Sequence, residues 1–154
     1  MNKTHITFAK SALALAAAAL LLAACGKGGE KSAAAPADGI EVKIGHVAPL
    51  TGPIAHLGKD NENGARLALE EINKAGLTID GKKVVLTLVP EDDAEDPKTA
   101  TQVAQKLVDA KVVGVVGHLN SGTSIPASRI YSDAGITQVS PSATNPDYTK
   151  QGFK

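Results

Sequence analysis

An alternation of apolar strand-like runs and helical segments, beginning at Ile40, constrains the fold of this chain more than any other sequence feature. The run from Val84 to Val89 is too uniformly apolar for a strand with one face in water, so helices are expected on both of its faces. Helices between successive strands require right-handed crossovers and a parallel sheet. The order βαβαβαβ therefore predicts an α/β domain with three layers. The four expected strands are Val42–Val47, Lys83–Pro90, Val112–Val116 and Ile136–Ser140.

Capping signals predict where the first two helices begin and end. Asp60 and Asn61 are the expected entry caps of the first helix, and Gly76 is its expected left-handed stop. Asp96 followed by Pro97 combines a capping carboxylate with a proline at the first helical position. The second helix is therefore expected to begin at this pair.

The sequence after the third helix lacks a closing element. That helix is expected over Ser121–Ser132, with Gly135 as its stop, and the residues after Ser140 show no further helix or strand pattern. The fourth strand would then have no covering helix beyond it. We therefore expect residues 40–154 to form part of a larger domain.

Residues 1–24 have the composition of an export signal. Lys3 and Lys10 precede the uncharged run Ala12–Ala24. That run is too short to remain as a membrane span, since a bilayer core needs about 20 apolar residues. The small residues before Cys25 resemble a bacterial lipobox, which implies cleavage before Cys25, acylation of that cysteine and a lipid anchor in a membrane. The alternative is an ordinary secretory signal, with Cys25 free or removed.

The segment that follows the expected cleavage site indicates a spacer. Residues 25–39 are rich in Gly, Lys, Ser, Ala and Pro and offer no apolar face to bury. We expect a flexible tether here, which begins at the lipidated Cys25. The protein is accordingly expected in the periplasm or cell envelope, anchored to a membrane.

Charge and composition exclude several classes of function. The 16 basic residues balance the 16 acidic ones, and no block of Lys and Arg offers a basic stripe, so nucleic-acid binding is not expected. With Cys25 as its single cysteine, the chain has neither an internal disulfide framework nor a Cys-rich zinc site. No G-x-G-x-x-G follows a strand and no serine lies in G-x-S-x-G, so the motifs of nicotinamide binding and of nucleophile-elbow hydrolases are both missing. No cofactor is expected.

Polar residues gather in the segments that follow the expected strands, where open parallel sheets bind ligands. The start of the third helix, with Ser121 and Gly122, offers free N–H groups to an anion. The proline-flanked stretch with Ser142 and Thr144 offers hydroxyls and carbonyls to an ammonium group. An anion site beside a cation-accepting site fits an α-amino acid. The alternative is that these residues only cap the helix and shape turns.

Three other kinds of site at this edge of the sheet have weaker support from the sequence. The segment Gly117–Ser124 nearly forms a phosphate-binding loop, but Thr123 occupies the position of the required lysine. The acidic run Glu91–Asp96 lacks the spacing of a calcium loop, and we interpret it as a solvated loop before a helix. His46, His56 and His118 match no zinc spacing, so no metal is expected and His118 is interpreted as a hydrogen-bonded organiser of its loop.

An enzyme with Ser121 as nucleophile and His118 as base is a further alternative, but the sequence supplies no orienting acid and no identifiable oxyanion hole. The chain is therefore not expected to be an enzyme.

Short motifs spread in order along residues 40–154 resemble the leucine/isoleucine/valine-binding proteins of bacterial ABC transporters. Because the similarity is distributed over the whole domain, it is more specific than any single motif. The motifs are Ile44-Gly45, Pro49-Leu50-Thr51-Gly52-Pro53, Gly64-Ala65, Glu71-Ile72-Asn73, Asp92-Asp93, Asp96-Pro97, Gly117-His118-Leu119, Ser121, Pro126-Ala127, Tyr131 and Pro141-Ser142-Ala143-Thr144.

The resemblance implies the first lobe of a type I periplasmic binding protein, without the second lobe. It implies that Ser121 binds the α-carboxylate of the ligand, while the Ser142 carbonyl and the Thr144 hydroxyl bind its α-ammonium group. Leu57 stands where relatives often have a ligand-contacting aromatic residue. Glu95 and Asn120 stand where relatives often have a cystine.

The resemblance also implies the partners. The chain would deliver a branched-chain or related amino acid to the membrane-embedded permease of an ABC importer. An alternative within the same fold is a sensor or receptor module that responds to amino acids or amides.

Overall fold

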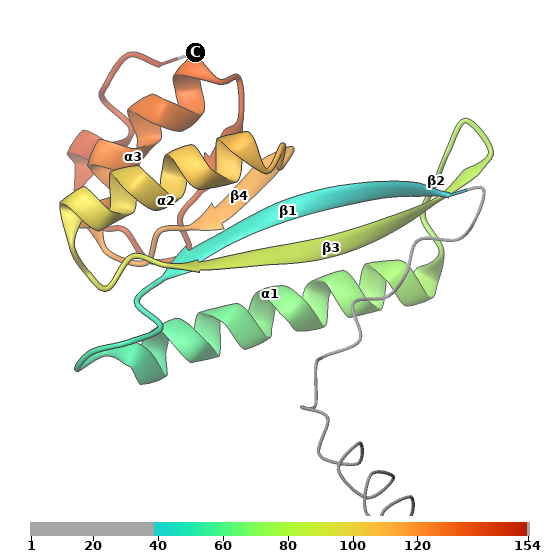
Figure 1. Cartoon of the computed structure of the whole chain (residues 1–154), viewed down its shortest axis with the longest axis horizontal. Coiled ribbons are helices and arrows are strands. Elements are labelled where there is room, and N and C mark those ends of the chain that lie inside the picture. Colours follow the sequence, from blue (N-terminus) through green and yellow to red (C-terminus); the bar gives the residue numbers. More distant parts are fainter. Residues whose placement is uncertain (1–38, 154) are drawn as a thin grey trace, which may run out of the picture. The chain divides into compact units, whose positions relative to one another are not determined.

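The computed structural model of this chain describes residues 39–153. They form three layers: α1 covers one face of the sheet, and α2 and α3 cover the other (Figure 1). The expected three-layer α/β architecture is confirmed. The elements are β1 (Ile40–Ala48), α1 (Ala55–Ala75), β2 (Thr78–Ile79), β3 (Lys82–Asp92), α2 (Pro97–Asp109), β4 (Gly114–Gly117), α3 (Ser121–Asp133), β5 (Thr137–Val139) and the short 3-10 helix η1 (Pro146–Tyr148).

The sheet has the strand order β2-β3-β1-β4-β5. The pairs β1/β3, β1/β4 and β4/β5 are parallel, as helical crossovers require. The expectation of four parallel strands is incomplete, however, because β2 pairs antiparallel with the start of β3. Asp80 and Gly81 join these two strands with φ angles of 50° and 76°, which suits a two-residue hairpin turn.

Helix α1 begins earlier than the capping signals predict. It starts at Ala55, and Ile54 in the N-cap position makes no side-chain cap hydrogen bond. Asp60 and Asn61 therefore lie inside the helix, and their predicted role as entry caps is wrong. The predicted stop is confirmed: Gly76 is the C-cap at φ 83° and donates its N–H to the Ile72 carbonyl.

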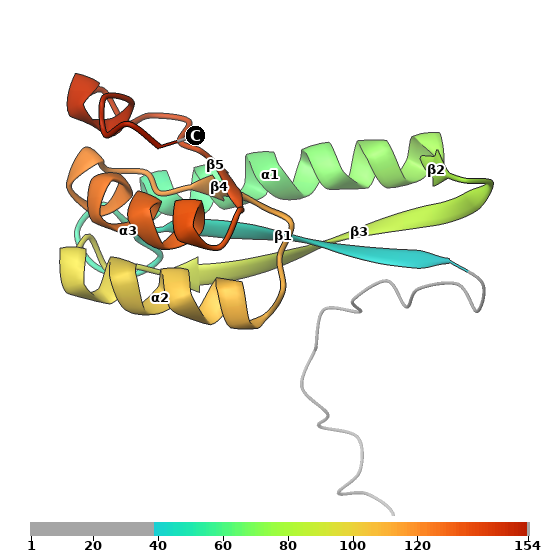
Figure 2. The same cartoon turned by 90° about the horizontal axis from the view of Figure 1, so that it is seen from above.

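The start of α2 agrees with the prediction. The Asp96 side chain accepts a hydrogen bond from the backbone N–H of Thr99 at 2.7 Å, and Pro97 occupies the first helical turn. Helix α2 packs beside α3 on one side of the sheet (Figure 2). The buried residues of α2 face this side, and the core lies there. The core residues are Val47, Val103, Ala104, Leu107, Val112, Val115, Ala127 and Tyr131.

Other predictions fall on residues that the structure does not describe. The export signal (residues 1–24), the lipidated Cys25 and the tether up to residue 38 lie outside the described part of the chain. Within residues 39–153, no helix is both long enough and apolar enough to span a bilayer.

Candidate functional site

The carboxyl ends of the parallel strands meet at one edge of the sheet. In the strand register Ala48 lies beside Asp92, and Val47 lies beside Gly117. Val116 in turn lies beside Val139. The segments that follow these strands, which the sequence analysis selected for their polar residues, are therefore neighbours in space.

Ser121 joins two of these segments. Its Oγ atom accepts hydrogen bonds from the backbone N–H groups of Thr144 and Asn145, each at 3.1 Å. The structure thus brings together the start of α3 and the stretch after β5, as expected. A hydroxyl has two acceptor sites and one proton. With both acceptor sites occupied, the Ser121 proton is left to donate to another group.

The N-terminus of α3 has free donors. Asn120 is the N-cap residue, but its side chain makes no cap hydrogen bond. Its Nδ2 atom instead donates to the Glu95 carboxylate at 3.2 Å. The N–H groups of Ser121 and Gly122 make no hydrogen bond within the described residues. Such a helix end favours an anion, because its N–H dipoles point outward.

The stretch after β5 uses some of its polar groups to hold its own position. The Ser142 hydroxyl donates to the Leu119 carbonyl at 2.9 Å, and the Ser140 hydroxyl donates to the His118 carbonyl at 2.6 Å. The Ser142 carbonyl and the Thr144 hydroxyl, by contrast, have no partner among residues 39–153. Both are acceptors, and both are of the kind that an ammonium group needs.

The other two predicted ligand contacts, Gly122 and Leu57, are not linked to Ser121 or Thr144 by hydrogen bonds. Gly122 is exposed at the start of α3, and a Cβ atom added there would meet no atom within 4 Å. Leu57 lies in the first turn of α1 with 44% of its surface exposed. It reaches the same sheet edge through the segment after β1, but no hydrogen bond links it to Ser121 or Thr144.

The acidic run Glu91–Asp96 is the predicted solvated loop before a helix only in its second half, where Glu95 and Asp96 are exposed; Glu91 and Asp92 belong to β3. The Asp92 carboxylate accepts from the Leu50 N–H at 2.8 Å and from the Thr51 hydroxyl at 2.6 Å. Asp93 is fully buried. Glu91 pairs with Lys106 at 2.7 Å. These side chains organise the loops around the site, and the described part of the chain contains no group of three potential metal ligands.

The contribution of Asp92 to the free energy of unfolding should depend on pH in the acid range. Burial alone would raise the pKa of Asp92, but hydrogen bonds from Thr51, Ala94 and Leu50 outweigh it and hold the pKa below its ordinary value of 3.8. A group with a depressed folded-state pKa stabilises the fold above its unfolded pKa, and this contribution is lost as the pH falls through the folded pKa. The unfolding free energy of the unaltered protein should therefore fall as the pH drops below about 4, and it should fall less steeply in Asp92→Asn. Urea denaturation at a series of pH values measures this. An unchanged slope would contradict this role.

A buried chain of three polar side chains lies beneath the site. The Nδ1 atom of His118 is 2.8 Å from the Asp93 carboxylate, and its Nε2 atom is 3.2 Å from the Tyr131 hydroxyl. All three side chains are buried. The interpretation of His118 as a hydrogen-bonded loop organiser is confirmed. Its partners Asp93 and Tyr131 were not predicted, although Asp93 follows a buried strand and Tyr131 falls on the inner face of α3.

The other two histidines do not join it in a metal site. His46 is fully buried, and neither of its ring nitrogens has a hydrogen-bond partner in the described part of the chain. Burial lowers the pKa of His46, and the Glu62 carboxylate partly opposes this effect. His56 is exposed.

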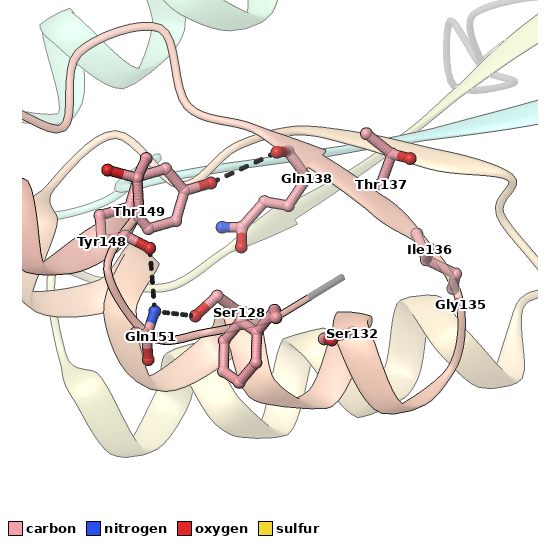
Figure 3. Close-up of a pocket in the computed structure, with 10 residues that line it drawn as sticks. Ser128, Ser132, Gly135, Ile136, Thr137, Gln138, Tyr148, Thr149 and Gln151 are labelled. Carbon is pink, nitrogen blue, oxygen red and sulfur yellow. Dashed lines mark hydrogen bonds between the residues drawn. The ribbon is translucent and has the colours of Figure 1, made fainter.

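A cavity of about 460 Å³ lies away from the predicted site, between α3, β5 and η1 (Figure 3). The Tyr148 hydroxyl crosses it to the Gln138 carbonyl at 3.4 Å, and Gln151 reaches the Ser128 hydroxyl at 2.7 Å. None of the predicted ligand contacts lines it. The lining residues are Ser128, Ser132, Gly135, Ile136, Thr137, Gln138, Tyr148, Thr149, Gln151 and Phe153.

Known proteins match this chain over nearly all of its described residues. A family described as periplasmic binding proteins matches residues 41–153. The Leu/Ile/Val-binding protein homolog 1 of Brucella abortus is 46% identical over 113 residues, which are 73% of this chain and 30% of that protein. The leucine-specific-binding protein of Salmonella typhimurium is 46% identical over 114 residues, 74% of this chain and 30% of that protein.

Solved structures agree with the sequence matches. The branched-chain amino acid transporter substrate-binding protein LivJ from Streptococcus pneumoniae, in complex with isoleucine, matches with a TM-score of 0.65 and 38% identity, covering 71% of this chain and 31% of that chain. An ABC transporter substrate-binding protein from Desulfitobacterium hafniense, in complex with Leu, matches with a TM-score of 0.62 and 38% identity, covering 73% of this chain and 32% of that chain. The present chain therefore spans about 30% of the length of these relatives.

Proposed function

This chain belongs to the periplasmic binding protein family, a family of binding proteins and not of enzymes, and from that premise we propose that it binds an amino acid for an ABC importer. The family places the protein in the periplasm. The similarity to Leu/Ile/Val-binding proteins that the sequence indicated is confirmed by the matches.

The observation that carries the proposal is the pairing of free donors with free acceptors around Ser121. On one side are the Ser121 hydroxyl proton and the unpaired N–H groups of Ser121 and Gly122. They suit a carboxylate, since charge-assisted hydrogen bonds to a helix N-terminus are strong. On the other side are the Ser142 carbonyl and the Thr144 hydroxyl, which suit an ammonium group. An α-amino acid carries both groups on one carbon.

The side chain of the ligand is proposed from the relatives. One is named for leucine, isoleucine and valine, another for leucine, and two related structures hold isoleucine and leucine. The exposed apolar side chain of Leu57 at the same edge is compatible with a branched aliphatic ligand. We therefore assign this chain to branched-chain or closely related amino acids, delivered to a membrane-embedded permease.

Attachment to the membrane is a separate part of the proposal. The small residues before Cys25 support removal of residues 1–24 and acylation of the cysteine, with residues 25–39 as the tether. Mass spectrometry of the mature protein should find an acylated Cys25 as the first residue. An unmodified Cys25 would refute the anchor without affecting ligand binding.

Calorimetry on the longest polypeptide that the gene encodes tests the binding proposal. The panel contains leucine, isoleucine and valine, together with 4-methylpentanoate, which lacks the ammonium group, and isopentylamine, which lacks the carboxylate. At least one amino acid should bind, and loss of either charged group should weaken binding about 100-fold or more, because each removes hydrogen bonds to a charged group. Binding of none of the amino acids, or equal binding of 4-methylpentanoate, would refute the proposal.

Gly122 provides a variant that separates folding from binding. Because open space surrounds its missing Cβ, Gly122→Ala should leave the melting temperature unchanged or raise it slightly. The added methyl group should, however, obstruct a carboxylate that approaches the N–H groups at this helix end, and we expect amino-acid affinity to fall about tenfold. Thermal unfolding and calorimetry on the same preparation check both effects. Unchanged affinity would place the carboxylate elsewhere.

A further inference from the structure

We propose that His118 is a positioning residue for the proposed amino-acid site. We call this site, formed by Ser121, Gly122, Ser142 and Thr144, the ligand seat. His118 would fix the spacing between its carboxylate-binding end and its ammonium-binding end. The inference rests on the proposed function, since it concerns how the same seat is held in shape. His118 itself touches no ligand in this proposal. It acts through the residues that its ring and its carbonyl group bind.

The ring of His118 is fixed at both nitrogens. Asp93, directly after β3, lies 2.8 Å from Nδ1, and Tyr131, on α3, lies 3.2 Å from Nε2. An ionised carboxylate only accepts hydrogen bonds, so Nδ1 carries the proton. The other ring nitrogen, Nε2, lies within hydrogen-bond distance of the Tyr131 hydroxyl. Burial and the nearby Asp93 carboxylate raise the pKa of Tyr131, so this hydroxyl keeps its proton to donate.

The carbonyl group of His118 is also bound twice. The Ser124 hydroxyl on α3 donates to it at 3.0 Å, and the Ser140 hydroxyl after β5 donates to it at 2.6 Å. Ser140 continues the link, because its Oγ atom accepts from the Ala143 N–H at 2.9 Å. One residue thus connects the segment after β3, the first turns of α3 and the stretch that carries Thr144.

These links bear on the seat itself. Ser121 belongs to the first turn of α3, and Thr144 to the stretch anchored through Ser140. A change in the ring or carbonyl of His118 would shift these two elements relative to each other. A misplacement of about 1 Å in a polar site is enough to weaken binding strongly.

A purely structural role is the competing explanation, because all three side chains of the chain Asp93–His118–Tyr131 are buried. In that case their loss would lower stability, and ligand affinity would be unaffected once the protein is folded. The two roles are separated by variants that remove one polar link each and by a control that destabilises the same core elsewhere.

The experiment uses the longest polypeptide of the gene and four variants. Tyr131→Phe removes the hydroxyl and keeps the ring, and His118→Asn keeps a donor for Asp93 while losing the link to Tyr131. Tyr148→Phe is the matched control, since it removes only a hydroxyl whose hydrogen bond is to the Gln138 carbonyl beside the separate cavity, and it leaves the backbone bonds of Tyr148 in place. Val103→Ala is the stability control, because Val103 lies in the core without a polar link to the seat.

Two readouts are taken from each variant. Amide NMR shifts of Thr144 and Asn145 report the position of the seat without ligand, since both N–H groups bond Ser121. Calorimetry with leucine, or with whichever panel amino acid binds most tightly, reports affinity. We expect Tyr131→Phe and His118→Asn to shift both amides and to weaken binding about five- to tenfold. Tyr148→Phe and Val103→Ala should stay within about twofold, even where Val103→Ala lowers the melting temperature more.

The outcomes distinguish this inference from the proposed function. If no panel amino acid binds the unaltered protein, the proposed function fails, while the amide shifts still decide whether His118 positions the seat. If the amides of Thr144 and Asn145 do not move in Tyr131→Phe and His118→Asn, the positioning role is overturned. Affinity that falls equally in Val103→Ala would also overturn it. Imidazole nitrogen shifts should show His118 protonated at Nδ1, and protonation at Nε2 alone would contradict the geometry.

Discussion

Replacing Ser121 with alanine is expected to weaken amino-acid binding about 30- to 100-fold. In the proposed function the Ser121 hydroxyl donates to the ligand carboxylate, and a hydrogen bond to a charged group contributes about 1.5–3 kcal/mol. It also removes the acceptor that holds the N–H groups of Thr144 and Asn145 at 3.1 Å. The acceptors for the ammonium group would then be less well placed. The loss should therefore exceed that of a single contact.

Two variants on the same helix serve as controls for Ser121→Ala. Ser132→Ala removes a hydroxyl of α3 that makes no hydrogen bond in the described structure, so its affinity should remain within about twofold. Ser121→Thr keeps a hydroxyl at the same position and should recover part of the affinity. Calorimetry with leucine measures all three variants. A loss below about threefold in Ser121→Ala would show that the carboxylate does not bind at this helix end.

Replacing Gly58 with alanine is expected to lower the free energy of unfolding by about 3 kcal/mol or more. Alanine normally stabilises a helix relative to glycine by about 0.5–1 kcal/mol. Here the new Cβ atom would lie 2.0 Å from the Pro49 carbonyl oxygen and 2.7 Å from the Pro49 carbonyl carbon. Both atoms belong to the backbone, and Pro49 is buried. The first turn of α1 would have to move off the end of β1, which costs packing and hydrogen bonds.

Gly64 is the matched control in the same helix. A Cβ atom added at Gly64 would have no neighbour within 4 Å, so Gly64→Ala should show the ordinary gain of about 0.5–1 kcal/mol. The two substitutions are chemically identical and lie in one element, yet the expected changes have opposite signs. Urea denaturation measures both. A stabilised Gly58→Ala would show that α1 does not approach the Pro49 backbone this closely in solution.

Short elements and helix starts were the parts of the fold that sequence patterns predicted least well. β2 has two residues, which is too few for the alternation that reveals a strand. The pair Asp80-Gly81 is nevertheless a hairpin signal, and reading it would have indicated the antiparallel strand. The start of α1 gave no such signal, because Ile54 has no side chain able to cap it. Its position depends on the approach of Gly58 to Pro49, which is a tertiary contact.

At the ligand seat, too, some contacts could be predicted from the sequence and others could not. Ser121 and Thr144 could be placed together from the sequence, because parallel strands bring their carboxyl ends to a shared edge. The pairing of His118 with Asp93 and Tyr131 could not, since strand topology brings segments together but does not say which way their side chains point. Nor could the acidic run be assigned. Its carboxylates bind loop N–H groups and side chains whose positions no spacing rule predicts.

The sequence by itself determined the layers, the parallel direction of the main strands and the edge at which polar segments meet. These follow from apolar periodicity and from the handedness of crossovers, which are local or topological properties. Only the tertiary structure decided which polar groups at that edge are already paired and which remain free. A hydrogen bond requires donor and acceptor to lie within about 3 Å at a suitable angle, and that condition is met or missed only when the whole chain is folded.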